Sequence, residues 1–168
     1  RFGYFAPPSN QYSKHRGEAF IAAVEQRGHE CSEYKPGYRV GRKLGWAEQQ
    51  RRVSRWLQSL PTPVAILSVD AYRGRQLAEI CHLRGIRVPD DVAILAGDAN
   101  ELMCEVSTPP LSNVNVASER IGYDAAILLD GMMEGQPASS VPLCVPPRGI
   151  THRQSTDLLA IEDPAVVD

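Results

Sequence analysis

The sequence lacks the features typical of membrane, secreted and disulfide-stabilised proteins. No apolar run approaches the roughly 20 residues that a membrane-spanning helix needs, and no charged segment followed by an apolar one opens the chain. The four cysteines, Cys31, Cys81, Cys104 and Cys144, form no CxxC pair, and we expect them to be reduced thiols. We therefore predict a cytoplasmic protein with no membrane partner.

Basic charge is also scarce. The 168 residues carry 18 Lys and Arg against 20 Asp and Glu, which gives a formal net charge of −2. A DNA-binding domain normally has a basic excess, because neutralising phosphates supplies most of its affinity. The densest basic stretches include Arg39, Arg42, Lys43, Arg51, Arg52 and Arg55. We interpret these residues as the solvated side of an amphipathic segment, so that the chain itself is not expected to bind nucleic acid.

The motifs of several enzyme classes are missing. Neither phosphate-binding pattern, G-x-x-x-x-G-K-[ST] or G-x-G-x-x-G, follows a strand, and no G-x-S-x-G elbow provides a nucleophile. The four histidines are scattered without metal-ligand spacing. The sequence therefore predicts no catalytic residue, no metal and no cofactor.

What the sequence does contain is a regular alternation of strand-like and helix-like stretches. We predict strands at residues 2–6, 29–34, 64–69, 92–96, 112–116 and 141–145, and helices at 13–27, 45–60, 75–84 and 118–134. With 43% hydrophobic residues, a chain of this length can form one domain with a buried core. The alternation predicts an α/β fold with an open, mainly parallel sheet flanked by helices on both faces.

Two aspartates follow the most apolar of these strands. Asp70 comes directly after strand 64–69, and Asp98 comes two residues after strand 92–96. Since ligands bind at the carboxyl ends of parallel strands, we expect both carboxylates to face one crevice. Two alternatives remain open: an acid/base pair as in glycoside hydrolysis, and structural roles as a helix N-cap and a turn residue.

Tyr12 and Arg16 complete the candidate site. They are four residues apart at the start of a predicted helix, so they share one helix face just beyond the first strand. A protein holds a neutral polyol with an aromatic face against the ring, an arginine that donates to hydroxyls, and carboxylates that accept from them. We therefore predict Tyr12, Arg16, Asp70 and Asp98 as the ligand-binding residues, in an arrangement suited to a neutral polyol.

Several stretches also carry a family likeness that covers nearly the whole chain. They are Arg16-x-x-Ala-Phe, Gly-Ile-Arg-Val-Pro-Asp-Asp-Val-Ala-Ile at 85–94, Pro-Pro-Leu-Ser at 109–112, Glu-Arg-Ile-Gly-Tyr at 119–123 and Arg-Gln-Ser-Thr-Asp at 153–157. With these stretches the chain resembles the effector-binding domain of lac-repressor-type and periplasmic sugar-binding proteins. The likeness is greater to the xylose-operon regulators, which carry an arabinose-regulator-type DNA-binding domain.

The resemblance implies roles for particular residues. Arg16 matches the sugar-binding arginine of the family and Asp98 its sugar-binding aspartate, while Asp70 stands where many members have a ligand-binding asparagine. Tyr12 falls near a position that is aromatic in similar regulators. Val116 departs from the pattern, since some members place a polar ligand residue there.

The resemblance also implies a domain organisation and a function. Residues 1–168 would be mainly the C-terminal lobe of a two-lobed domain, with 117–135 belonging to an N-terminal lobe that precedes Arg1. A helix-turn-helix domain is expected after residue 168, and the regulator would sense xylose, form a homodimer and contact DNA through that domain alone. A transport-linked sugar-binding protein and a small hydrolase using Asp70 and Asp98 are the alternatives.

Overall fold

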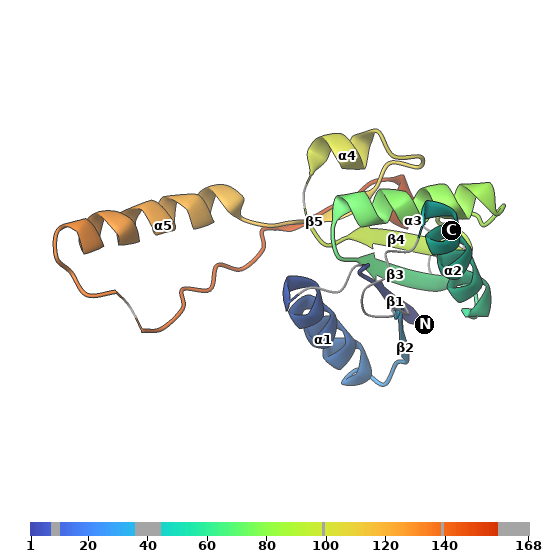
Figure 1. Ribbon diagram of the computed structural model, residues 1–168, viewed down its shortest axis with the longest axis horizontal. Coiled ribbons are helices and arrows are strands. Elements are labelled where there is room, and N and C mark those ends of the chain that lie inside the picture. The colour runs from blue at the N-terminus through green and yellow to red at the C-terminus, as the bar shows by residue number, and fades with distance from the viewer. Residues whose placement is uncertain (8–10, 36–44, 99, 139, 158–168) are drawn as a thin grey trace, which may run out of the picture.

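The computed structural model describes residues 1–7, 11–35, 45–98, 100–138 and 140–157. A six-stranded sheet forms its centre, in the order β2-β1-β3-β4-β5-β6 (Figure 1). The strands are β1 (Phe2–Phe5), β2 (Cys31–Glu33), β3 (Val64–Ser68), β4 (Val92–Ala96), β5 (Ser112–Asn115) and β6 (Gly149–Thr151). Strands β1 to β5 are parallel, and β6 pairs antiparallel with β5.

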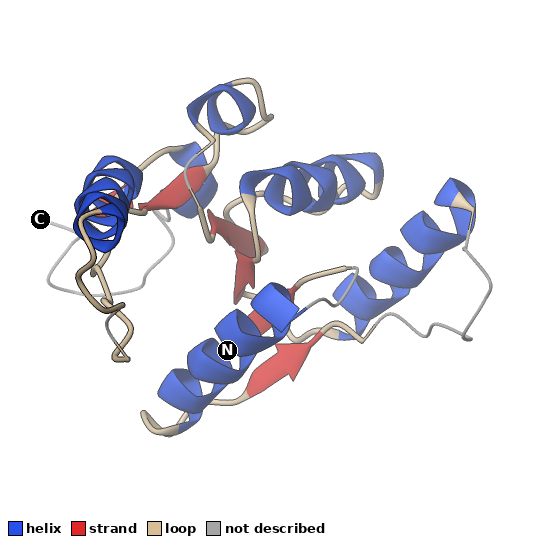
Figure 2. Cartoon of the chain, turned by 60° about the vertical axis from the view of Figure 1, so that its left-hand side comes forward, coloured by secondary structure: helices blue, strands red, loops and turns tan. Residues whose placement is uncertain are grey.

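The helices are α1 (Gln11–Glu25), α2 (Trp46–Ser59), α3 (Ala71–Leu83), α4 (Glu101–Glu105) and α5 (Ser118–Met133), followed by a 3-10 turn at Gln154–Thr156. Helices flank the strands on both sides (Figure 2). These features confirm the predicted α/β class with an open, mainly parallel sheet. Arg39, Arg42 and Lys43, three of the basic residues noted above, lie outside the described residues.

The main hydrophobic core lies between the sheet and helices α2 and α3. Phe5, Ile66 and Ile94 point from adjacent strands to this face, where they meet Leu57 of α2 and Leu77 of α3. All five side chains are almost completely buried. Because side chains alternate between the two faces of a strand, the neighbours of these residues point the opposite way.

A smaller cluster covers the other face, against α1. It contains Tyr4, Leu67 and Val69 from the strands, with Phe20 of α1 packed against them. Leu95 of β4 also points this way but is only partly buried. The α1 side of the sheet is therefore covered less completely than the α2 and α3 side.

Helix α5 projects away from the sheet (Figure 1). The predicted apolar stripe on this helix comprises Ile121, Ala125, Leu128, Leu129 and Met132, yet none of the residues of α5 is buried. The helix forms where the sequence predicts it, but the side chains of its apolar stripe remain exposed. No helix among the described residues is long and apolar enough to cross a membrane.

Three local predictions were wrong. No strand forms at 141–145; the sheet partner is β6, a few residues later, because Pro142, Pro146 and Pro147 lack the N–H that a strand ladder requires. Helix α3 starts at Ala71 instead of residue 75, since Asp70 caps it. The short helix α4 is absent from the predicted helices, although its Asn100 side chain caps it by accepting from the backbone N–H of Met103 at 3.1 Å.

The turn at Gln154–Thr156 is fixed to the sheet by Ser155. The Ser155 hydroxyl donates to the carbonyl of Ile94 at 2.6 Å and accepts from the backbone N–H of Ser112 at 2.8 Å. The residue is fully buried, so water does not replace these bonds. Ser155 therefore ties the segment after β6 to both β4 and β5.

We expect Ser155→Ala to lower the free energy of unfolding by about 1–3 kcal/mol, because it leaves a buried carbonyl and a buried N–H unpaired. Urea denaturation measures this change. The matched control is Ser59→Ala, whose hydroxyl donates to the carbonyl of Trp56 at the surface, and its expected effect is within about 0.5 kcal/mol. Equal losses in the two variants would contradict this account of Ser155.

Candidate functional site

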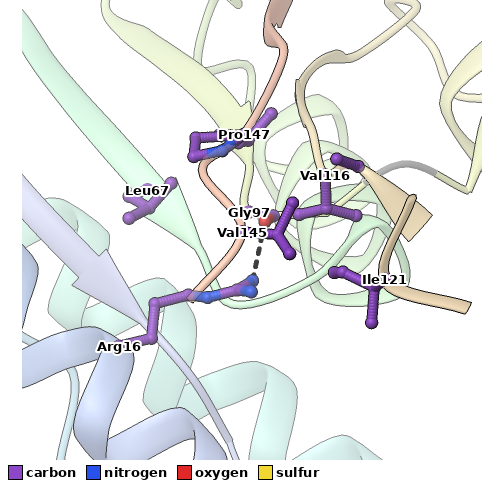
Figure 3. A pocket seen from close by; sticks show the side chains of 9 residues that line it. Arg16, Leu67, Gly97, Val116, Ile121, Val145 and Pro147 are labelled. Carbon is purple, nitrogen blue, oxygen red and sulfur yellow. Dashed lines mark hydrogen bonds between the residues drawn. The ribbon is translucent and has the colours of Figure 1, made fainter. Parts of the chain in front are cut away.

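Arg16 reaches from α1 to the carboxyl ends of β3 and β4. Its Nη1 donates to the carbonyl of Val69 at 2.5 Å and to that of Gly97 at 2.7 Å (Figure 3). Tyr12 lies one helical turn earlier, with its ring centroid 4.5 Å from the guanidinium carbon, in a cation–π contact. The two side chains share a face, as predicted, and together they lie over the ends of two neighbouring strands.

Gly97 permits this approach. A Cβ atom at position 97 would lie 2.5 Å from Arg16 Nη1 and 2.7 Å from the Val69 carbonyl, so a side chain there would displace the guanidinium. Sequence reasoning did not single out this residue. The available signal was a glycine between the end of a buried strand and Asp98, a position where another group often approaches the backbone.

Tyr4 of β1 holds the first turns of α1 against the sheet. The Tyr4 hydroxyl donates to the carbonyl of Ser13 at 2.6 Å, and the ring lies so close to Gly17 that a Cβ atom there would collide with it. Burial raises the pKa of Tyr4 to about 12, which keeps the hydroxyl protonated as a donor. This buried contact orients the turns that carry Tyr12 and Arg16.

Asp70 and Asp98 both bind the first turn of α3. Oδ1 of Asp70 accepts from the backbone N–H of Arg73 at 2.7 Å, and Oδ1 of Asp98 accepts from that of Ala71 at 3.1 Å. Both residues are half-buried. The N-cap alternative for Asp70 is therefore present in the structure, and Asp98 also satisfies one of the free N–H groups at the start of α3.

The four predicted residues influence one another electrostatically. Burial raises the pKa of Asp98; the N–H of Ala71 and the charge of Arg16 lower it, and the charge of Asp70 raises it. The pKa of Tyr12 is also raised, by burial first, and Arg16, Asp98 and Asp70 all act on it. Tyr12, Arg16, Asp70 and Asp98 thus form one cluster, which we call the Arg16 cluster.

A cavity of about 300 Å³ adjoins the Arg16 cluster, a size at the lower end for small-molecule sites. It is lined by Arg16, Leu67, Gly97, Val114, Val116, Ala117, Ile121, Val145 and Pro147 (Figure 3). Arg16 and Gly97 connect it to the cluster, while the lining is otherwise mostly aliphatic. Tyr12, Asp70 and Asp98 are outside this lining. Sequence reasoning had noted Val116 only as a departure from the family pattern, and had missed the wall at Val145 and Pro147.

The Arg16 cluster offers both hydrogen-bond donors and hydrogen-bond acceptors to a ligand. Arg16 supplies guanidinium N–H donors, and the two aspartates supply acceptors, beside the aromatic ring of Tyr12. Among the described residues, no three His, Cys, Asp or Glu side chains gather in a way that could hold a metal ion. The groups present are suited to binding a small polar molecule.

The fold and the cluster at the strand ends define a ligand-binding domain. Residues 1–156 match the periplasmic binding protein-like domain, and the chain belongs to this family. It is similar to the xylose operon regulatory protein of Haemophilus influenzae, with 32% identity over 99% of this chain and 42% of that protein. The corresponding protein of Escherichia coli K12 is 29% identical over 99% of this chain and 43% of that protein. The chain thus spans less than half the length of these curated relatives.

Solved structures agree with this assignment. The xylose-binding transcription activator XylR has a TM-score of 0.83 and 30% identity, covering 99% of this chain and 44% of that chain. A LacI family transcriptional regulator from Bifidobacterium animalis shares the fold, with a TM-score of 0.69 and 22% identity over 92% of this chain and 54% of that one. These findings confirm the predicted resemblance to the xylose regulators and to the broader fold family.

The raised pKa of Asp98 gives a testable dependence on pH. The folded protein binds a proton at Asp98 more readily than the unfolded chain, so this carboxyl lowers stability as the pH rises from its ordinary value of 3.8 through the raised pKa. We expect Asp98→Asn, which keeps an acceptor for Ala71, to have a higher melting temperature than the original protein at about pH 7 and an unchanged one at about pH 3.

Asp91→Asn is a control, for which the expected change in melting temperature at neutral pH has the opposite sign. Hydrogen bonds from Arg87 lower the pKa of Asp91, so this carboxylate stabilises the fold above 3.8 and loses that effect as the pH falls through the lowered pKa. Its substitution should reduce the melting temperature at about pH 7 and have little effect at low pH. If Asp98→Asn instead lowers the melting temperature at neutral pH, the burial of Asp98 is not its dominant influence.

Proposed function

We propose that this chain is part of the sugar-sensing domain of a bacterial transcription regulator, with xylose as its ligand. The observation that carries the proposal is the convergence of Arg16, Asp70 and Asp98 at the carboxyl ends of the adjacent strands β3 and β4. Parallel sheets bind ligands at this edge. The names of the relatives support the choice of sugar and the regulatory role.

In this proposal the Arg16 cluster binds sugar hydroxyls directly. Nη1 of Arg16 is engaged by two carbonyls, which fixes the guanidinium plane and directs its other N–H groups to the ligand. Asp70 and Asp98 are each anchored through Oδ1 to α3, which orients the carboxylates as acceptors. Tyr12 contributes an aromatic ring that is 51% exposed. The cluster binds its ligand without catalysing a reaction, and the regulators among the relatives support a role other than that of an enzyme.

We also propose the domain organisation of the whole regulator. Residues 1–168 form mainly its C-terminal lobe, residues 117–135 pack within an N-terminal lobe, and a helix-turn-helix domain follows residue 168. Helix α5 supports this arrangement, since its apolar stripe is exposed here. The regulator is a cytoplasmic homodimer that contacts DNA through the helix-turn-helix domain, and xylose closes the two lobes on each other.

Asp98→Ala in the intact regulator tests the site. The loss of a buried acceptor leaves sugar hydroxyls unpaired, and we expect xylose affinity to fall at least about tenfold in calorimetry. Asp70→Asn should have a smaller effect because the amide keeps an acceptor, and the exposed Asp90→Asn is the control. If Asp98→Ala and Asp70→Ala both melt early yet bind xylose normally, the aspartates are structural and the ligand site lies elsewhere.

The domain proposal has its own test. A chain of residues 1–168, shown to be folded by circular dichroism, should bind xylose at least about tenfold more weakly than the intact regulator, because it supplies one side of the cleft. Calorimetry on both proteins makes the comparison. Equal affinities would mean that residues 1–168 enclose the sugar on their own, which contradicts the two-lobed assignment.

A further inference from the structure

The Arg-Gln-Ser-Thr-Asp stretch at 153–157 follows β6 and contacts β4 and β5 through Ser155. Arg153 at its start is a partly buried cation, with 14% of its side chain exposed. Its Nη1 donates to the carbonyl of Leu111 at 3.0 Å and to Oδ1 of Asn113 at 2.6 Å, and its Nη2 donates to the carboxylate of Glu101. The guanidinium is therefore fixed in one orientation by three different partners.

Glu101 brings this contact close to the sugar site. It is the first residue of α4 and follows Asp98 by three positions, with Asn100 between them as the N-cap. Asn100 also donates to the Tyr72 hydroxyl of α3 at 3.4 Å. A shift of the first turn of α4 would thus reach the first turn of α3, where the N–H of Ala71 binds the Asp98 carboxylate.

Three contacts from different parts of the chain lie at or near Asp98. Arg16 of α1 binds the carbonyl of Gly97, the N–H of Ala71 in α3 binds the carboxylate of Asp98, and Arg153 binds Glu101. The first two contacts belong to the Arg16 cluster. The third comes from the segment after β6, which Ser155 ties to the sheet.

We propose that Arg153 is a positioning residue for the sugar site, which acts through Glu101 to place the Asp98 carboxylate. The contact also couples the ligand site to residues 153–157, beyond which the chain continues toward its C-terminus. An ion pair whose acid is 57% exposed adds little net stability. Its contribution is geometric: it selects one position for the start of α4. This inference rests on the proposed function.

Glu101→Gln in the intact regulator is the main test. The side chain is exposed and keeps its shape, so folding should be unaffected, whereas xylose affinity should fall about three- to tenfold in calorimetry. Glu105→Gln, at the other end of α4 and also exposed, is the matched control and should bind xylose normally. Normal xylose affinity in Glu101→Gln would overturn the proposal.

A double-mutant cycle separates positioning from a general loss of structure. Arg153→Gln should weaken xylose binding, and adding Glu101→Gln to it should weaken binding no further, since both act through one contact. Fully additive losses would show that the two residues act independently, against the proposal. If Arg153→Gln does not fold, the single variant Glu101→Gln still decides the outcome.

Hydrogen exchange gives a readout that a purely structural contact would not change. Coupling between two sites is reciprocal, so xylose should slow amide exchange across residues 153–157 in the original protein and have less effect in Glu101→Gln. If the amide exchange rates of residues 153–157 are the same with and without xylose, the proposed coupling is contradicted. The variant Asp98→Ala keeps the two proposals distinguishable: if it binds xylose normally the proposed site fails, and if it alone loses affinity only the role of Arg153 fails.

Discussion

The bond from Arg16 to the carbonyls of Val69 and Gly97 is the contact on which the site depends. It joins α1 to the carboxyl ends of β3 and β4 through a single charged side chain. It requires a residue without a side chain at position 97. It also requires α1 to keep a fixed position relative to the sheet. The buried Tyr4 hydroxyl of β1 holds the helix there by donating to the carbonyl of Ser13. The two carbonyls that Arg16 binds belong to the residues that directly precede Asp70 and Asp98.

Asp70 and Asp98 illustrate how structural and binding roles combine at such an edge. Each carboxylate satisfies an N–H at the start of α3, where the helix dipole favours negative charge. Burial nevertheless raises the pKa of Asp98, so this carboxylate is less stable in the folded protein than it would be in water. A group kept at some cost to stability is typical of a binding site.

Helix α5 exposes apolar residues that a stable domain would normally bury. A single helix of 16 residues gains little stability in water on its own, and apolar side chains such as Leu128, Leu129 and Met132 are exposed along it. The sheet side of the molecule, in contrast, has a packed core on one face and a smaller cluster on the other. In the proposed domain organisation, α5 would bury its apolar stripe within the other lobe.

Sequence alone determined the class of fold, the central strands and the identity of the polar residues at their ends. Short apolar runs such as 64–69 and 92–96, bounded by turn residues, are typical of central strands in a parallel sheet, and a residue that directly follows such a strand lies at its carboxyl edge. Local pattern failed where partners decided the outcome. The stretch 141–145 has strand-forming residues but does not join the sheet, and the apolar stripe of α5 has helical period but remains exposed in the part of the chain that the structure describes. Only the tertiary structure reveals the roles of Gly97 and Val145 and the contact between Arg153 and Glu101. Each depends on segments that are distant in sequence and that the pairing of the strands brings together.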